Sequence, residues 1–147
     1  MIVKECLETT DPEDNKMPNL DAQLMKVPEP SLVFIKGDST KVLRGMTATM
    51  VLIKPIVYID ISNALDISYQ YSILFERGYN MYWYSCPGYN ENNYKGNRFD
   101  ITKDSFYIAI LAVHNTVEIP DGGLDLPRID GPTDTWMKAY DRTREST

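Results

Sequence analysis

The sequence predicts an α+β fold rich in β structure: a mostly antiparallel sheet, sandwich-like or barrel-like, with one or two short helices and extended terminal arms. Three observations predict this class. Apolar, β-branched and aromatic runs of strand length recur between residues 31 and 119. Both ends of the chain are rich in proline and acidic residues and lack sustained periodicity. A length of 147 residues, 43% of them hydrophobic, is enough for one globular core.

These observations divide the chain into three parts. Residues 1–30 hold four prolines, three lysines and seven acidic residues, which predicts an acidic extended arm. Residues 31–119 are expected to form the β-rich core domain. Residues 120–147 begin as a Pro/Gly-rich tail and end in "TDTWMKAYDRTR", which predicts a short helix capped by Thr133 or Asp134.

The first half of the core is expected to be made of strands. The runs "SLVFIK" and "TKVLR" flank "GDS", a pattern typical of a β-hairpin. The run "TATMVLIKPIVYID" is apolar and β-branched, and Pro55 predicts a break in it because proline cannot donate to a ladder. Later in the chain, "MYWYSC" and "SFYIAILAV" predict two further strands.

Residues 64–78, "ALDISYQYSILFERG", fit two patterns. As a strand, alternate positions are apolar or aromatic; as a helix, Ser62 or Asn63 would cap it and Gly78 would end it. Propensity favours a strand, because Ile, Tyr and Phe dominate, and we predict one that pairs with "MYWYSC". The helix alternative implies a small Rossmann-like α/β fold with a strand–helix–strand unit at 56–86.

Asp60 ends an apolar run within "YIDISNAL". This stretch resembles the first motif of haloacid-dehalogenase-type phosphatases, in which a nucleophilic Asp is followed two residues later by an acid–base Asp. Ser62 stands at that second position here, so the group that protonates the leaving group is missing. The resemblance implies roles for Asp60, Ser85 and Lys103 in a phosphatase, and a nuclease-like metal site at Asp60 is a related alternative. We expect Asp60 to begin a turn instead, and assign no catalytic residue.

Metal and cofactor sites lack support in the sequence. His114 is the only histidine, and with Cys6 and Cys86 it forms none of the spacings that bind zinc. A Cys–His dyad is one alternative, but we expect His114 to be a buried, hydrogen-bonded residue at the end of a strand. Glycine-rich nucleotide-binding motifs do not occur. The sequence therefore predicts no metal and no cofactor.

The net charge of −6 argues against binding to nucleic acid or to anionic membranes, both of which require basic surfaces. The longest apolar run is too short to span a bilayer. The first residues lack the pattern of a signal peptide. We therefore expect a protein of the cytoplasm or of a virion, neither transmembrane nor secreted through a signal peptide.

Residues 78–100 hold five of the ten tyrosines, together with Trp83 and several asparagines. Tyr, Trp and Asn are common on recognition surfaces, because they offer large contact area and adaptable hydrogen bonds. The alternative is that the aromatic residues simply form core. The predicted binding surface consists of Tyr79, Trp83, Tyr89, Asn92 and Tyr94, with Trp136 and Tyr140 from the C-terminal helix.

Together these features predict a non-enzymatic assembly or protein-binding module that self-associates through its terminal arms. Ordering an arm costs about 1–2 kcal/mol per residue, which packing on a partner would offset. Small size, arms and missing catalytic motifs favour a viral or phage structural or accessory protein. The alternatives are a small α/β metal-dependent phosphatase or nuclease-like enzyme, and a carbohydrate-binding β-sandwich that uses the tyrosine-rich surface of residues 79–94.

Overall fold

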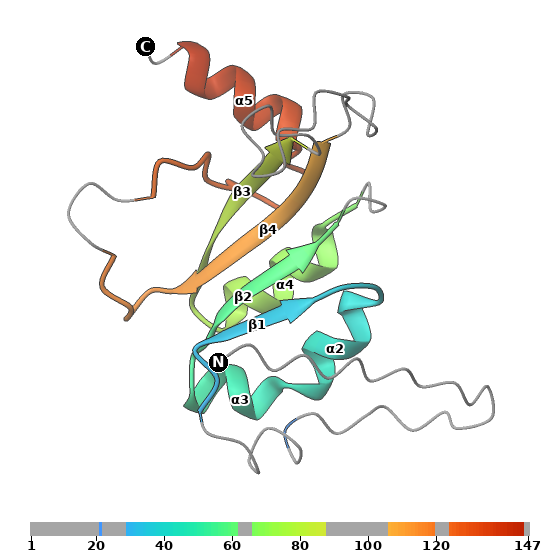
Figure 1. Ribbon diagram of the computed structural model, residues 1–147, viewed down its shortest axis with the longest axis vertical. Helices are drawn as coiled ribbons and strands as arrows, with labels where there is room; N and C mark the ends of the chain where they lie inside the picture. Colours follow the sequence, from blue (N-terminus) through green and yellow to red (C-terminus); the bar gives the residue numbers. More distant parts are fainter. Residues whose placement is uncertain (1–20, 22–28, 62–65, 88–105, 120–123, 146–147) are drawn as a thin grey trace, which may run out of the picture.

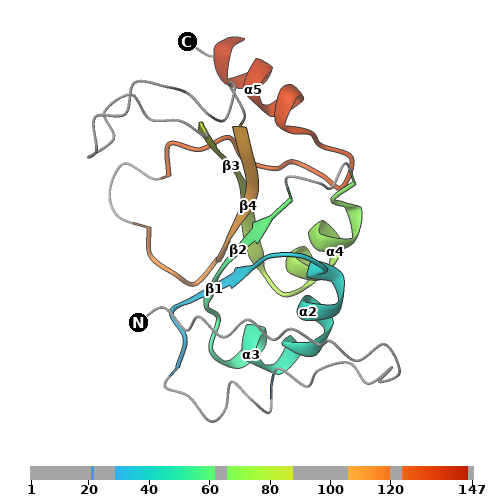
Figure 2. The same ribbon diagram turned by 45° about the vertical axis from the view of Figure 1, so that its right-hand side comes forward.

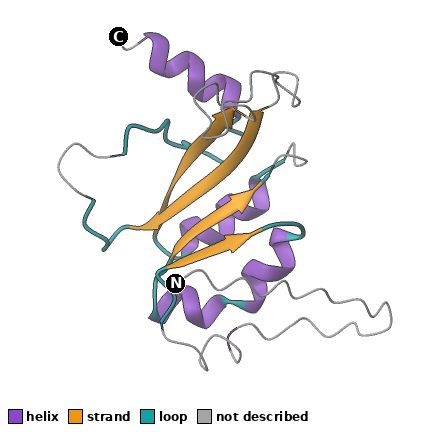
Figure 3. Cartoon of the chain, viewed as in Figure 1, coloured by secondary structure: helices purple, strands orange, loops and turns teal. Residues whose placement is uncertain are grey.

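The structure is a computed structural model that describes residues 21, 29–61, 66–87, 106–119 and 124–145. Four strands form one open sheet in the order β1-β2-β4-β3 (Figures 1 and 3). β1 runs parallel to β2, whereas β4 runs antiparallel to both β2 and β3. In chain order the elements are β1 (Leu32–Ile35), α2 (Ser39–Gly45), α3 (Thr47–Leu52), β2 (Ile56–Asp60), α4 (Ser68–Glu76), β3 (Tyr79–Pro87), β4 (Phe106–His114) and α5 (Trp136–Glu145).

The α+β class predicted from the sequence is confirmed, but the sheet differs from the expected one. It is mixed and is not closed into a barrel. Parallel neighbours such as β1 and β2 need a crossover connection, and α2 and α3 provide it. The unit β2-α4-β3 of the Rossmann-like alternative is present, yet β4 lies antiparallel between its two strands. The sheet is therefore not a doubly wound parallel one.

The predicted hairpin around "GDS" is wrong, because the residues after it form helix α2. Gly37 adopts a φ of 100°, which lets the chain turn sharply after β1. The Asp38 carboxylate then accepts a hydrogen bond from the backbone N–H of Lys41 at 3.3 Å. The same residues that favour a hairpin turn thus start and cap a helix.

The run "TATMVLIKPIVYID" contains a helix and a strand instead of strands alone. Residues Thr47–Leu52 form α3, and β2 begins after Pro55, where the break was expected. The Asp21 carboxylate accepts hydrogen bonds from the backbone N–H groups of Ala48 and Thr49 at 2.9 and 2.8 Å, and from the Thr49 hydroxyl. A side chain from far along the chain therefore caps this β-branched helix.

The strand predicted at 64–78 is also wrong, because Ser68–Glu76 forms helix α4. Asp66 accepts a hydrogen bond from the Ser68 N–H at 2.8 Å, which satisfies one donor of the first turn. At the other end Gly78 has a φ of 78° and donates to the Phe75 carbonyl at 3.0 Å. These end signals, which the sequence contains, outweigh the β propensity of the residues between them.

One face of the sheet packs on α2, α3 and α4, which all lie on the same side in Figure 2. Residues of both central strands point into this core, including Val57, Ile59 and Ile110, none of which is exposed. The helices contribute Leu43, Met46, Met50 and Leu74, also fully buried. The predicted C-terminal helix is confirmed as α5, and the Trp136 and Tyr140 rings lie 5.9 Å apart. Its cap is Thr135, whose hydroxyl accepts from the Lys138 N–H at 3.3 Å, not Thr133 or Asp134.

Candidate functional site

The face of the sheet opposite α2, α3 and α4 carries large apolar side chains that reach solvent. Side chains alternate between the two faces along each strand, so the register of the sheet assigns each residue to a face. Leu32, Phe34 and Tyr107 are 54%, 60% and 53% exposed. We name this surface the open face, and its residues are Leu32, Phe34, Ile56, Tyr58, Asp60, Asn80, Tyr82, Tyr84, Cys86, Tyr107, Ala109, Leu111 and Val113.

A row of aromatic rings crosses the open face from β1 to β3. The ring centroids of Phe34 and Tyr58 are 5.1 Å apart, and the rings are stacked at 15°. Tyr58 then meets Tyr84 edge to face, with centroids 5.8 Å apart. These two tyrosines lie on either side of β4, where Ala109 is 1% exposed. A small residue at this position leaves room for the two rings to touch above it.

The open face carries little charge for a protein with a net charge of −6. Burial raises the pKa of Tyr58, and the neighbouring Tyr84, Asp60 and Cys86 raise it further, so its hydroxyl stays neutral at physiological pH. Asp60 is the acidic residue of this face. At the rim, Arg128 donates a hydrogen bond to the Asn80 side chain at 3.1 Å. The surface is therefore aromatic and close to neutral.

The residues proposed for a phosphatase are not brought together by the described part of the chain. Asp60 pairs with Ala109 on the open face, whereas Ser85 pairs with Ile108 and points to the helix side. Lys103 lies outside the described residues. Asp60 ends β2 and is not in a hairpin turn, because α4 follows instead of a paired strand. Within the described ranges, no group of three or more His, Cys, Asp or Glu side chains is placed to hold a metal ion.

His114 is a buried, hydrogen-bonded residue at the end of β4, as expected. It is 9% exposed, and its Nδ1 accepts a hydrogen bond from the Thr116 backbone N–H at 3.2 Å. Tyr79 packs against the ring edge to face at 5.2 Å. Cys86 pairs with Tyr107 at the opposite end of the β3–β4 ladder, so the two residues do not form a Cys–His dyad.

The binding surface predicted from the aromatic residues requires a correction. Tyr79 and Trp83 are 2% and 3% exposed and belong to the core, because alternation turns them toward the helices. Tyr140 is 44% exposed on α5 and Trp136 is half-buried against the core. The remaining predicted residues lie outside the described ranges: Tyr89, Asn92 and Tyr94.

Sequence reasoning missed the aromatic row itself. Phe34 of "LVFI" and Tyr58 of "IVYID" lie on the same face of the sheet. The register of β1 and β2 makes them neighbours across the two strands. The signal lay in the alternation of "MYWY", where Met81 and Trp83 are buried, whereas Tyr82 and Tyr84 at the alternate positions are partly exposed. Composition alone treated both sets of aromatic residues as one surface.

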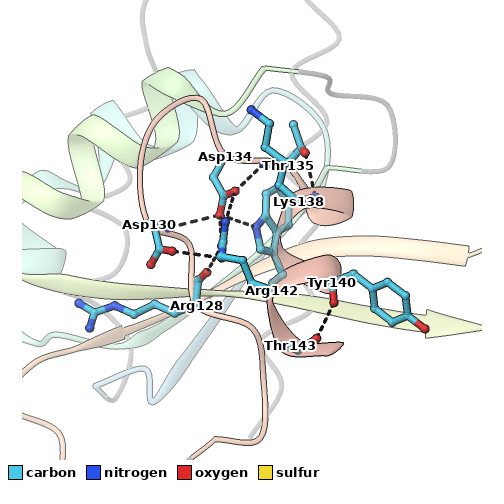
Figure 4. A network of polar contacts seen from close by, with 9 residues as sticks. Arg128, Asp130, Asp134, Thr135, Lys138, Tyr140, Arg142 and Thr143 are labelled. Carbon is cyan, nitrogen blue, oxygen red and sulfur yellow. Dashed lines mark hydrogen bonds and ion pairs between the residues drawn. The ribbon is translucent and has the colours of Figure 1, made fainter. Parts of the chain in front are cut away.

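A second feature missed is a buried carboxylate that fastens the C-terminal segment to the sheet (Figure 4). The Asp134 side chain, 4% exposed, accepts from both terminal nitrogens of Arg142 at 2.8 and 3.0 Å. It also accepts from Trp83 Nε1 and from the Asp130 backbone N–H, each at 3.3 Å. Burial raises the pKa of Asp134, but these hydrogen bonds outweigh it and lower the pKa below the ordinary value. The network links β3 to α5 and has a structural role.

Compared with known proteins, the chain matches no protein-family profile, no curated sequence and no solved structure. Among the helices of the described segments, none is long and apolar enough to cross a bilayer. The open face is therefore the candidate site that rests on the geometry of this chain alone.

Proposed function

We propose that this protein is a non-enzymatic assembly module that docks a protein partner on the open face of its sheet. The observation that supports the proposal is the aromatic row with its exposed neighbours, since soluble chains rarely leave a contiguous apolar surface without a partner. Covering one large side chain such as Phe34 stabilises a complex by about 1.5–3 kcal/mol.

A second copy of the chain is the partner that fits this face best. The surface is nearly uncharged, so two copies meet there without bringing like charges into direct contact. A twofold axis places the same patch against itself, which suits a row of aromatic rings able to stack on one another. A setting as a viral or phage structural or accessory protein is part of the same proposal and rests on small size and on the absence of catalytic motifs from the sequence.

Terminal arms remain a second means of self-association in this proposal. The Asp21 carboxylate, however, contacts α3 of its own chain. A deletion that tests the arms should therefore end at residue 20 and leave this contact intact. The acidic composition makes nucleic acid and anionic membranes poor partners.

The enzymatic alternative has one supporting feature, the helix α4 that follows Asp60. It is opposed by the positions of Asp60 and Ser85 on opposite faces of the sheet. The carbohydrate-binding alternative uses tyrosines outside the described residues. We therefore take self-assembly through the open face as the proposed function.

The test compares two exposed phenylalanines. Phe34 on the open face is 60% exposed and stacks on Tyr58; Phe75 on α4 is 62% exposed and stacks on Tyr71 at 5.5 Å. The solution mass of the full chain, of Phe34→Ser and of Phe75→Ser is measured by sedimentation over a range of concentrations. We expect the unmodified chain and Phe75→Ser to exceed the monomer mass of 16.9 kDa, and Phe34→Ser to remain a monomer. An unmodified chain that stays monomeric, or a Phe34→Ser variant that keeps the higher mass, contradicts the proposal.

A further inference from the structure

β1 is an edge strand, and its outer side is unpaired within the described part of the chain. The backbone N–H of Ile56 donates to the Ser31 carbonyl at 2.9 Å. In a parallel ladder every second residue bonds to the neighbouring strand, so Val33 also faces β2. The N–H and C=O groups of Leu32 and Phe34 therefore point outward. Their side chains are also the most exposed of β1, at 54% and 60%.

We propose that two copies of the chain pair through β1 as antiparallel edge strands, with a twofold axis at Val33. This inference rests on the proposed function and adds a second contact between copies, at the sheet edge, which leaves the open face available for the docking proposed above. In this register Leu32 of one copy lies opposite Phe34 of the other, and the two residues exchange both backbone hydrogen bonds. The symmetry repeats the exchange, and one sheet then runs through both copies with a continuous open face.

The residues around β1 fit this arrangement. The register brings Lys36, which is exposed, opposite Pro30 of the second copy and next to its Glu29, an exposed acid. Charges of opposite sign therefore lie near each other at both ends of the paired strands. Pro30 has no N–H to donate, which confines the ladder to the centre of the strand.

Exposed apolar side chains also gather on this side of the molecule. Figures 1 and 2 both draw α3 beyond β1, at the end of the sheet farthest from β3. On α3, Val51 and Leu52 are 51% and 70% exposed. The helix that carries them lies at this end of the sheet, on the side away from the open face (Figure 2).

A single engineered cysteine tests the register. Val33 and its copy form a directly opposite, non-hydrogen-bonded pair with Cα atoms about 4.5 Å apart, a spacing that a disulfide can bridge. In full-length protein with Cys6 and Cys86 changed to serine, Val33→Cys should form a covalent dimer on mild oxidation. Val117→Cys, a 38% exposed position in the segment after β4, is the control and should stay monomeric on the gel.

Amide hydrogen exchange tests the same edge without a cysteine. The amides of Leu32 and Phe34 should exchange more slowly as protein concentration rises, whereas the amide of Val33, which faces β2, should not change. If Phe34→Ser dissociates the assembly but the Val33→Cys disulfide and the concentration-dependent protection are absent, the copies dock face to face; the edge pairing is then wrong and the proposed function stands. If the unmodified chain is a monomer, both fail. Leu32 and Phe34 amides already protected in that monomer would identify another segment of the chain as the occupant of the edge.

Discussion

At the scale of single residues, Asp21 acts on a helix far away in the sequence. Its carboxylate caps α3 by accepting hydrogen bonds from the backbone N–H groups of Ala48 and Thr49. No local sequence pattern predicts such a contact, because the Asp21 acceptor lies 27 and 28 positions from its two donors. The free N–H groups of a helix's first turn need acceptors, and the sequence does not state which residue will supply them.

Replacing Asp21 should destabilise the fold. Burial raises the pKa of its carboxyl, but the hydrogen bonds from Thr49 and Ala48 lower it more, so the folded-state pKa lies below the ordinary value. Its stabilisation is therefore complete above the unfolded-state pKa of about 3.9 and is lost as the pH falls through the folded-state value. We expect Asp21→Ala to lower the free energy of unfolding at neutral pH by about 1 kcal/mol.

Urea denaturation of Asp21→Ala measures this loss. The exposed Asp125 provides a control of equal charge change, and Asp125→Ala should differ little from the unmodified chain. Equal stability of the two variants would show that the Asp21 contact contributes nothing.

His114 should make the stability of the fold depend on pH in the mildly acidic range. Burial lowers its pKa, nearby Lys54 lowers it further, and a hydrogen bond to the Arg77 backbone only partly offsets them. The unfolded chain therefore binds a proton more readily than the folded one, and stability falls as the pH drops below the unfolded-state pKa of about 6.5. The loss levels off below the folded-state pKa.

We expect His114→Asn to remove that part of the pH dependence, because asparagine keeps an acceptor for Thr116 but does not titrate. The free energy of unfolding is measured for both proteins in a pH series that crosses the unfolded-state value. Parallel curves for the two proteins would contradict the assignment.

At the scale of elements, two glycines with a positive φ flank helices: Gly37 precedes α2 and Gly78 follows α4. They differ in the space that a side chain would find. Gly37 has a φ of 100°, and a Cβ at this position would meet no atom within 4 Å. A Cβ at Gly78 would lie 3.2 Å from His114 Nε2 and 3.4 Å from the side-chain Nδ2 of Asn115. Gly37→Ala should cost about 1–2 kcal/mol, the penalty for a side chain in the left-handed region. Gly78→Ala should cost more, because the β4 end must also shift. Thermal unfolding of the two variants measures the difference in stability. Equal losses of stability would show that the close contacts around Gly78 add no cost.

The attachment of α5 depends on a buried ion pair, and a double-mutant cycle measures its strength. Asp134 is almost fully buried while Arg142 is 42% exposed, so solvent weakens the pair but does not abolish it. We expect a coupling free energy above about 1 kcal/mol between Asp134→Asn and Arg142→Met. The exposed Lys41–Asp38 pair, at 3.4 Å, is the control, and its coupling should stay below about 0.5 kcal/mol. Similar couplings in the two cycles would show that burial of Asp134 does not matter.

The elements also show which parts of the fold the sequence could predict. The four strands follow from β-branched and aromatic runs, and Pro55 marks the break before β2 correctly. Helices α2 and α3 were missed, because Ser39–Gly45 and Thr47–Leu52 are short and are capped by Asp38 and Asp21. Helix α4 was considered as the alternative to the strand that propensity favoured. Side-chain caps and burial against the sheet outweigh propensity in short helices. The open face depended on strand order and register, which no local pattern contains.

At the scale of the whole molecule, helices cover one face of the sheet (Figure 2). The other face ends at the edge strand β1, whose Leu32 and Phe34 side chains are exposed. Four exposed apolar residues belong to β1 and α3, the elements at that end of the sheet: Leu32, Phe34, Val51 and Leu52. Large apolar side chains on a sheet face gain stability when another layer packs on them. Self-assembly supplies that cover within the proposed function.

The charge of the chain predicts how salt changes this assembly. Each copy carries a net charge of −6, so two copies repel one another at long range, while the contact surface itself is nearly neutral. Added salt shortens the Debye length to about 10 Å at 0.1 M and screens the repulsion, but it leaves apolar burial intact. Sedimentation equilibrium should therefore give a tighter dimer at moderate than at low ionic strength, and Phe34→Ser should be a monomer at both. A dimer that weakens with salt would instead indicate that ion pairs, and not apolar burial, hold the interface together.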